Sequence, residues 1–259
     1  MYEPSALERI EQALSTCSIG HRILYRPVVT STMDVAREEA ERGAPEGTVV
    51  VAEEQTAGRG RFGRRWLSIP GKNLSFSVLL YPSAWASARL SVAAPVAVLR
   101  ALRQVTGLSP TLKWPNDLLL DGKKVCGILI ESAFQDAEVR QAVIGIGINV
   151  NLNPSGQMEL VYPATSLAER LGSPVSREEV LQSVLEELGV VYDSLKGWAD
   201  AWLEWQASLE TLGKAVQVRW RDQVEEGVAE GVDSEGKLLL RRADGTVIAL
   251  AAGEVTFRV

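Results

Sequence analysis

The sequence predicts an α+β protein in which a sheet-forming unit with several helices is followed by a small antiparallel β-barrel. Along the first 150 residues, short segments rich in Val, Ile and Leu alternate with Gly, Pro, Asn and Asp, which is typical of strands. A long helical pattern follows Ser176. After Gly213 the pattern changes to short alternating segments separated by glycines, which is typical of a small barrel.

The predicted helices are identified by their periodicity and their end signals. The strongest begins at the capping box Ser176–Glu179, after which apolar residues recur every three or four positions as far as Trp202. Pro95 implies a kink or a later start in the helix that contains it. We expect helices within Pro4–Ser15, from Thr32 to Arg42, from Ala88 to Val105 and from Ser176 through Trp202.

The predicted strands divide into two groups on either side of Gly213. In the first group the turn Asp121-Gly122 indicates a hairpin. The expected strands are Gly47–Glu53, Leu74–Tyr81, Leu112–Trp114, Lys124–Glu131 and Ala142–Asn149, then Ala215–Trp220, Glu225–Val232, Lys237–Arg242, Val247–Leu250 and Glu254–Val259. We therefore expect one domain at residues 1–212 and a second at residues 213–259.

Composition excludes several functional classes. The 27 Lys and Arg residues are outnumbered by 33 Asp and Glu residues, so the net charge of -6 would not draw the protein to DNA or to a membrane surface. No apolar run is long enough to span a bilayer, and the first 20 residues lack a signal-peptide core. Two cysteines and one histidine do not form a disulfide framework or a usual zinc site. We expect a cytoplasmic protein with free thiols.

An arginine and glycine loop at residues 55–66 is the most informative motif. Three glycines and four arginines gather here in an acidic protein, at Gly58, Gly60, Gly63, Arg59, Arg61, Arg64 and Arg65. Glycine lets the backbone approach a ligand closely, and arginine binds carboxylate and phosphate with paired hydrogen bonds, so the loop predicts an anion site. Gly58 to Gly63 also fits the dinucleotide fingerprint, but Pro70 and a following strand replace the helix that this fingerprint requires.

Three further segments are weak signals on their own and indicate a ligand site only when they are considered together with this loop. Lys113 to Asp117 alone is an ordinary turn after a strand. Gly145 and Gly147 fall on one face of a strand, which indicates that a ligand or another backbone lies against that face. Of the hydroxyls of Ser31 and Thr32, one is expected to cap the following helix and the other to be free.

In their order, these motifs resemble the catalytic domain of biotin-protein ligases. The resemblance covers about residues 24–152 and rests on four segments: the loop Gly58-Arg59-Gly60-Arg61 ending in Trp66, Lys113-Trp114-Pro115-Asn116-Asp117, Gly127-Ile128-Leu129-Ile130-Glu131, and the alternation Gly145, Gly147, Asn149. It implies a mixed sheet flanked by helices, as in class II aminoacyl-tRNA synthetases, with a C-terminal SH3-like barrel. It also implies the short form without an N-terminal DNA-binding domain, since 30 residues precede Ser31.

The resemblance implies the site residues one by one. Those for biotin are Ser31, Thr32, Met33, Gln55, Arg59, Gly60, Arg61, Lys124, Gly127, Gly145 and Gly147. Those for ATP are Arg61, Arg64, Trp66, Asn116, Lys124, Ile130 and Asn149, and the catalytic residues are Arg61, Lys124 and Asp117. Met33 departs from the family pattern, which usually has Asn. No dedicated metal ligands are implied, because magnesium arrives with the nucleotide.

The implied reaction joins biotin to a protein in two steps. ATP activates biotin as biotinoyl-5'-AMP with release of pyrophosphate, and biotin then passes to a lysine of a biotin carboxyl carrier protein. The alternatives are a lipoate ligase, an octanoyltransferase, which would need a nucleophilic cysteine, and a non-catalytic biotin sensor. Cys126 lies on an apolar strand, where a buried, inert thiol is expected. The resemblance allows a homodimer, and we expect no DNA or membrane partner.

Overall fold

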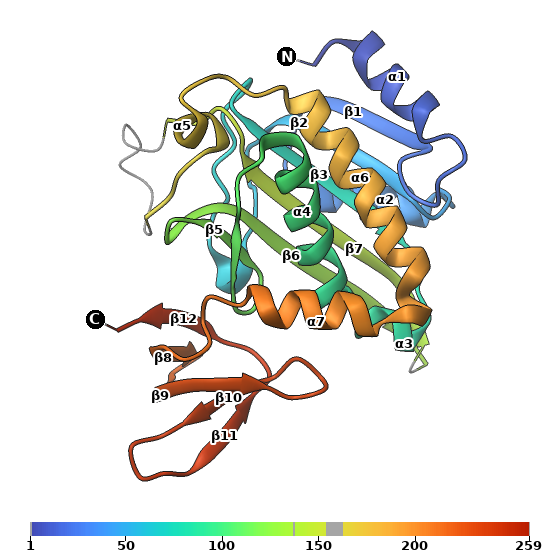
Figure 1. The fold of residues 1–259 in the computed structure, drawn as a ribbon. Coiled ribbons are helices and arrows are strands. Elements are labelled where there is room, and N and C mark those ends of the chain that lie inside the picture. The colour runs from blue at the N-terminus through green and yellow to red at the C-terminus, as the bar shows by residue number, and fades with distance from the viewer. Residues whose placement is uncertain (1, 137, 154–162, 259) are drawn as a thin grey trace.

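The computed structural model describes residues 2–136, 138–153 and 163–258, which form two β-sheets and the helices around them (Figure 1). The larger sheet has seven strands in the order β1-β2-β3-β7-β6-β5-β4. They are β1 (Arg22–Val29), β2 (Thr48–Gln55), β3 (Asn73–Leu80), β4 (Thr111–Lys113), β5 (Asp117–Leu120), β6 (Lys123–Gln135) and β7 (Glu138–Asn149). The β1–β2 pair is parallel and the other five pairs are antiparallel, so the sheet is mixed and the predicted α+β class is confirmed.

Different helices cover the two faces of this sheet. On one face α4 (Leu90–Thr106) and α6 (Arg177–Asp193) pack against Val49, Phe76 and Val78, while α2 (Thr32–Glu41) covers Val50 and Leu79 on the other face (Figure 1). Side chains alternate between the faces of a strand. Both faces of β3 are covered, so all eight of its residues are buried, including the polar residues Asn73, Ser75 and Ser77.

The remaining helices are short. α1 (Pro4–Ala13) packs on the side of the sheet nearest β1, and α3 (Ala84–Ser87), α5 (Leu167–Leu171) and the single-turn η1 (Arg61–Gly63) lie in connections. The helix containing Pro95 is continuous, as α4 runs from Leu90. None of the helices in the described part of the chain is long and apolar enough to cross a bilayer.

The predicted single helix from Ser176 through Trp202 is wrong. α6 ends at Asp193, a turn η3 (Ser194–Gly197) follows, and α7 (Ala199–Ser208) begins a new helix. The turn lets both helices pack against α4, where Arg100 lies 2.8 Å from Glu204 of α7 and 3.9 Å from Glu187 of α6. The apolar repeat continued through the turn because both helices bury the same kind of side chain.

Two strands of the large sheet were not predicted. β1 is an edge strand with charged residues and Pro27, so it lacks a clear alternation of apolar side chains. β5 is only four residues long, and the turn Asp121-Gly122 joins it to β6. The predicted hairpin exists, but its first strand is β5 and not the strand that ends near Trp114.

The C-terminal segment forms a separate five-stranded antiparallel sheet in the order β11-β10-β9-β8-β12. Its strands are β8 (Ala215–Trp220), β9 (Gln223–Val232), β10 (Leu238–Arg241), β11 (Val247–Leu250) and β12 (Glu254–Phe257). It lies against the larger unit at Trp114, whose ring nitrogen donates a hydrogen bond to the Gly236 carbonyl at 2.9 Å. The backbone nitrogen of Trp114 also donates to the Thr211 hydroxyl at 2.9 Å. One buried tryptophan therefore links β4 to the C-terminal sheet.

Candidate active site

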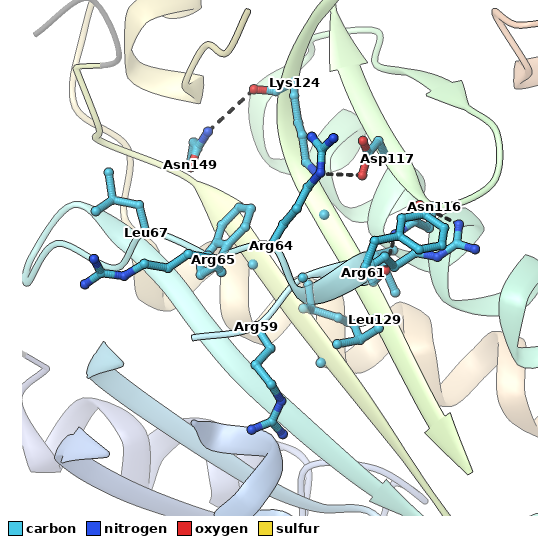
Figure 2. A pocket seen from close by; sticks show the side chains of 18 of the residues that line it. Arg59, Arg61, Arg64, Arg65, Leu67, Asn116, Asp117, Lys124, Leu129 and Asn149 are labelled. Atoms are coloured by element: carbon cyan, nitrogen blue, oxygen red, sulfur yellow. Dashed lines mark hydrogen bonds and ion pairs between the residues drawn. The ribbon is translucent and has the colours of Figure 1, made fainter. Parts of the chain in front are cut away.

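A cavity of about 370 Å³ lies where the arginine loop, the first half of β6, the end of β7 and the start of β12 meet (Figure 2). Its walls come from segments far apart in the sequence, namely the start of α2, the loop at residues 59–67, the turn at residues 113–117, and Gly253 to Val255. Its lining includes the cationic side chains of Arg59, Arg61, Arg64 and Lys124 and the apolar side chains of Met33 and Leu129. The cavity therefore offers a polar region and an apolar region to one ligand or to two adjacent ligands.

The arginine loop is held in shape by its own backbone. The nitrogen of Gly60 donates to the Arg64 carbonyl at 2.7 Å, and the nitrogen of Trp66 donates to the Gly58 carbonyl at 2.9 Å. Phe62 and Gly63, at the tip, have φ values of 58° and 71°. A left-handed conformation is unfavourable for phenylalanine, so the tip is a strained turn.

Three of the loop arginines have acidic or amide partners. Arg59 donates to both carboxylate oxygens of Asp34, at 2.9 and 2.8 Å, and in Figure 2 its side chain points away from Lys124 and Asp117. Its hydrogen bonds lower the pKa of the Asp34 carboxyl and Asp34 raises the pKa of Arg59. Arg64 pairs with Glu254 of β12. The hydrogen bond from Arg61 goes to the neutral Asn116, at 3.4 Å.

Lys124 lies at the start of β6 and forms an ion pair with Asp117 at 2.7 Å. Its ammonium nitrogen is 5.9 Å from the centre of the Trp66 ring. Asn116 donates to the Ile128 carbonyl and accepts from Arg61, so Asn116 orients Arg61 while the neighbouring Asp117 orients Lys124. Burial lowers the pKa of Arg61 and of Lys113 because it removes water from the charged forms.

The two glycines of β7 are covered by side chains. An added Cβ at Gly147 would lie 2.3 Å from the Trp66 ring, and one at Gly145 would lie 2.7 Å from the Met33 sulfur. The side chains of Trp66 and Met33 pack on this face, and the expected contact of a ligand with it stays a prediction. Both side chains also line the cavity, so the glycines set the depth of its floor.

Ser31 and Thr32 both have partners in the structure. The Ser31 hydroxyl accepts from the Met33 nitrogen at 3.3 Å and caps α2. The Thr32 hydroxyl donates to Gln55 at 3.1 Å and lies 2.8 Å from the Ser77 hydroxyl, so the prediction that the second hydroxyl is free is wrong. The three side chains at residues 32, 55 and 77 form a buried polar cluster at the cavity wall.

Comparison with known proteins assigns the chain to a family. The model of the biotin/lipoate A/B protein ligase family matches residues 25–149, and that of the biotin protein ligase C-terminal domain matches residues 211–258. The bifunctional ligase/repressor BirA of Bacillus subtilis is 37% identical over 241 residues, which cover 91% of this chain and 74% of BirA. The chain belongs to the biotin protein ligase family.

Solved biotin protein ligases have the same fold. The enzyme from Aquifex aeolicus in complex with biotin and ATP superposes with a TM-score of 0.77 at 30% identity, covering 92% of this chain and 98% of that one. The Leishmania major enzyme in complex with biotinyl-5-AMP has a TM-score of 0.63 at 29% identity, covering 89% of this chain and 99% of that one. The biotin--[acetyl-CoA-carboxylase] ligase of Paracoccus denitrificans is 36% identical over 80% of this chain and 89% of its own length.

The positions that the resemblance to biotin protein ligases implied are gathered around this cavity, with one exception. Ile130 does not line it, because its side chain lies on the β6 face that packs against the main core, opposite the face carrying Leu129. The other predicted side chains and glycines line it: Ser31, Thr32, Met33, Gln55, Arg59, Gly60, Arg61, Arg64, Trp66, Asn116, Asp117, Lys124, Gly127, Gly145, Gly147 and Asn149.

Several lining residues were missed. Phe62, Arg65, Lys113, Trp114 and Pro115 belong to the quoted motifs and were left out of the predicted site. Leu67, Phe76, Ile128, Leu129, Ile146, Leu152 and Ala164 also line the cavity, with Gly253, Glu254 and Val255 from the C-terminal sheet. The strand alternation that includes Gly127 would have indicated Leu129. No local signal indicates Glu254, since its place depends on how the two sheets pack together.

Replacing Gly147 by alanine tests whether the packing of the Trp66 ring on β7 requires a residue without a Cβ at position 147. We expect Gly147→Ala to displace the indole ring, break its hydrogen bond to Ser75 and lower the free energy of unfolding by about 1–3 kcal/mol. Denaturant unfolding measures this loss. The matched control is Gly231→Ala in β9, where the added Cβ would lie 3.9 Å from Leu239. Equal stability of the two variants would contradict the close packing of Trp66.

Proposed function

We propose that this chain activates biotin with ATP to form biotinoyl-5'-AMP and then transfers biotin to a lysine of a biotin carboxyl carrier protein. The observation that carries the proposal is one cavity that joins an apolar pocket to a cluster of cations. Relatives solved with biotin and ATP or with biotinyl-5-AMP support the choice of substrates. The name of the Paracoccus relative, a ligase of biotin to acetyl-CoA carboxylase, supports the acceptor class.

In this proposal biotin occupies the end of the cavity closed by Met33 and Gly145. Its ring system lies near Ser31, Thr32 and Gln55, whose polar groups suit a ureido ring, and its chain runs past Gly127 toward Lys124. The biotin carboxylate points toward Gly60, Arg61 and Lys124. Arg59 lines the cavity while each of its terminal nitrogens donates one hydrogen bond to Asp34, which leaves further N–H groups for the ligand.

ATP occupies the cationic end. Trp66 offers an aromatic face, and Asn116 and Asn149 offer amides to the base or ribose. Arg61, Arg64 and Lys124 are the cations for the phosphates. Ile130 stays a predicted nucleotide contact, although its side chain packs against the core and does not line the cavity. The acids of this region, Asp117 and Glu254, are already paired with Lys124 and Arg64, so magnesium is expected to arrive bound to the triphosphate.

Adenylation needs charge neutralisation more than a protein nucleophile. An oxygen of the biotin carboxylate attacks the α-phosphorus, the bond from that phosphorus to the bridging oxygen breaks, and pyrophosphate leaves with the electron pair. Arg61 and Lys124 reduce the repulsion between the two anions and stabilise the charge that develops on the phosphorus oxygens. The cavity holds the two substrates side by side, which lowers the entropic cost of the encounter.

Transfer requires a deprotonated acceptor amine. The amine nitrogen attacks the acyl carbon of the adenylate, the bond to the AMP oxygen breaks, and one proton leaves the nitrogen. Asp117 is the proposed group that orients the amine or accepts this proton, from its position 2.7 Å from Lys124. A normal rate of transfer from preformed adenylate in Asp117→Asn would contradict this role.

Pyrophosphate exchange into ATP tests the first step without an acceptor. We expect exchange with biotin and none with lipoate or octanoate. Arg61→Ala should lower the exchange rate by about 10²–10³-fold, because it removes a partly buried cation beside the phosphates. Arg26→Ala is the control, since Arg26 is exposed on β1 outside the cavity. Exchange with lipoate in place of biotin would overturn the choice of substrate.

The octanoyltransferase alternative depends on Cys126. This thiol is fully buried, and burial raises its pKa far above its ordinary value, so little thiolate forms at neutral pH. We expect Cys126→Ala to keep both adenylation and transfer of biotin to the carrier protein. Loss of transfer together with labelling of Cys126 by an acyl donor would favour the acyltransferase instead.

The proposal includes two domains, at residues 1–212 and 213–259, and a homodimer. β6 continues past the last residue paired with β5, and Phe134 near its end is 67% exposed, which leaves an open strand edge. Sedimentation of Phe134→Lys beside the unchanged protein tests the dimer.

DNA binding is not part of the proposal, given the net charge of -6, and a sequence-specific shift of DNA would contradict that. The two free thiols and the use of ATP support a cytoplasmic site of action.

A further inference from the structure

A buried ion pair lies behind the cavity, between β2 and the first residue of α6. Arg177 donates to both oxygens of Glu53, at 2.9 and 3.0 Å, and the two residues are 6% and 3% exposed. Glu53 also accepts from the Gly71 nitrogen at 3.0 Å. Burial alone would raise the pKa of Glu53, but the hydrogen bonds from Arg177 and Gly71 reverse this effect and the pKa is lowered. The Glu53–Arg177 pair is therefore a rigid, charged contact between β2 and α6.

Asn73, at the start of β3, connects the Glu53–Arg177 pair to the cavity. Arg177 donates to the Asn73 carbonyl at 3.1 Å, which fixes the backbone of Asn73. The side-chain oxygen of Asn73 accepts from the Ile69 nitrogen at 2.9 Å, and its side-chain nitrogen donates to the Asn149 side-chain oxygen at 3.0 Å. Asn73 is 1% exposed, so water does not replace these bonds.

The bond from Asn73 determines how the Asn149 amide is oriented. Because Asn73 offers an N–H group, Asn149 turns its oxygen toward Asn73 and its nitrogen toward the carbonyls of Thr165 and Lys124, at 3.0 and 3.5 Å. The reversed amide would set its oxygen against those two carbonyl oxygens. Asn149 lines the cavity beside Trp66, and in Figure 2 it lies next to the Lys124 backbone.

We propose that Asn73 is a positioning residue for adenylation, which fixes the amide of Asn149 on the nucleotide side of the cavity and takes its own position from the Glu53–Arg177 pair. The orientation presents an N–H of Asn149, which among the described residues is held only by the long 3.5 Å contact, to an acceptor atom of the nucleotide. The same bonds join β6, β7 and the segment at Thr165 beside Lys124. This inference rests on the proposed function.

The test is the isosteric substitution Asn73→Asp. It keeps the oxygen that accepts from Ile69 and replaces the donor to Asn149 by an acceptor, so Asn149 loses its fixed orientation. The matched control is Asn151→Asp, because Asn151 likewise accepts from a backbone nitrogen and donates to a carbonyl, both of Val175 and both at 2.9 Å, but does not line the cavity.

In the exchange assay with biotin, we expect Asn73→Asp to raise the KM for ATP roughly tenfold, with the KM for biotin within about twofold of the unchanged protein. Asn151→Asp should leave both constants within about twofold. KM does not depend on the folded fraction, so partial loss of folded protein leaves the comparison valid. Arg177→Lys, which keeps the charge but loses the paired hydrogen bonds, should shift the KM for ATP in the same direction.

Two results would overturn the inference. One is an equal rise of both constants in Asn73→Asp, and the other is the same KM for ATP in Asn73→Asp and Asn151→Asp. A failure of the proposed function is distinguishable, because the unchanged protein would then show no exchange with biotin. Unaltered kinetics in Asn73→Asp beside an active unchanged protein would contradict the positioning role alone.

Discussion

The cavity depends on the missing side chains of β7. At Gly145 and Gly147 the strand passes under Met33 and Trp66 with no room for a Cβ, and these two side chains then become the floor on which a ligand would rest. β7 also lies between β3 and β6 in the sheet, so it cannot move away to admit larger residues. A packing constraint at two backbone positions therefore sets where Met33 and Trp66, the last residue of the arginine loop, can lie.

The charges of the site are largely balanced within the protein. Arg59 is paired with Asp34, Arg64 with Glu254 and Lys124 with Asp117, whereas the hydrogen bond from Arg61 goes to the amide of Asn116. An anionic ligand that binds Arg59, Arg64 or Lys124 must displace the carboxylate paired with that cation or bind beside it. At Arg61 the partner is the neutral amide of Asn116, so no carboxylate competes in that bond. Ion pairs at partly exposed sites are worth little, so such an exchange costs less than it would in the interior.

The sequence was sufficient for the fold class and for most of the residues around the cavity, because both depend on local patterns. A motif such as Lys113 to Asp117 identifies several neighbouring site residues at once, and the alternation of side chains along a strand identifies its buried face. What could not be predicted depends on long-range packing. The helix predicted after Ser176 was extended through the turn at Ser194–Gly197, and Glu254 enters the site only through the contact between the two sheets.

The wall formed by Gly253 to Val255 has a consequence for synthesis of the protein on the ribosome. These residues lie at the start of β12, which pairs with β8 across the small sheet, whereas most of the other lining residues are translated more than a hundred residues earlier. The large sheet has all its strands once residue 149 has emerged, and domains fold as they emerge. A nascent chain thus carries an unfinished pocket until residues 253–255 have emerged and β12 has paired with β8.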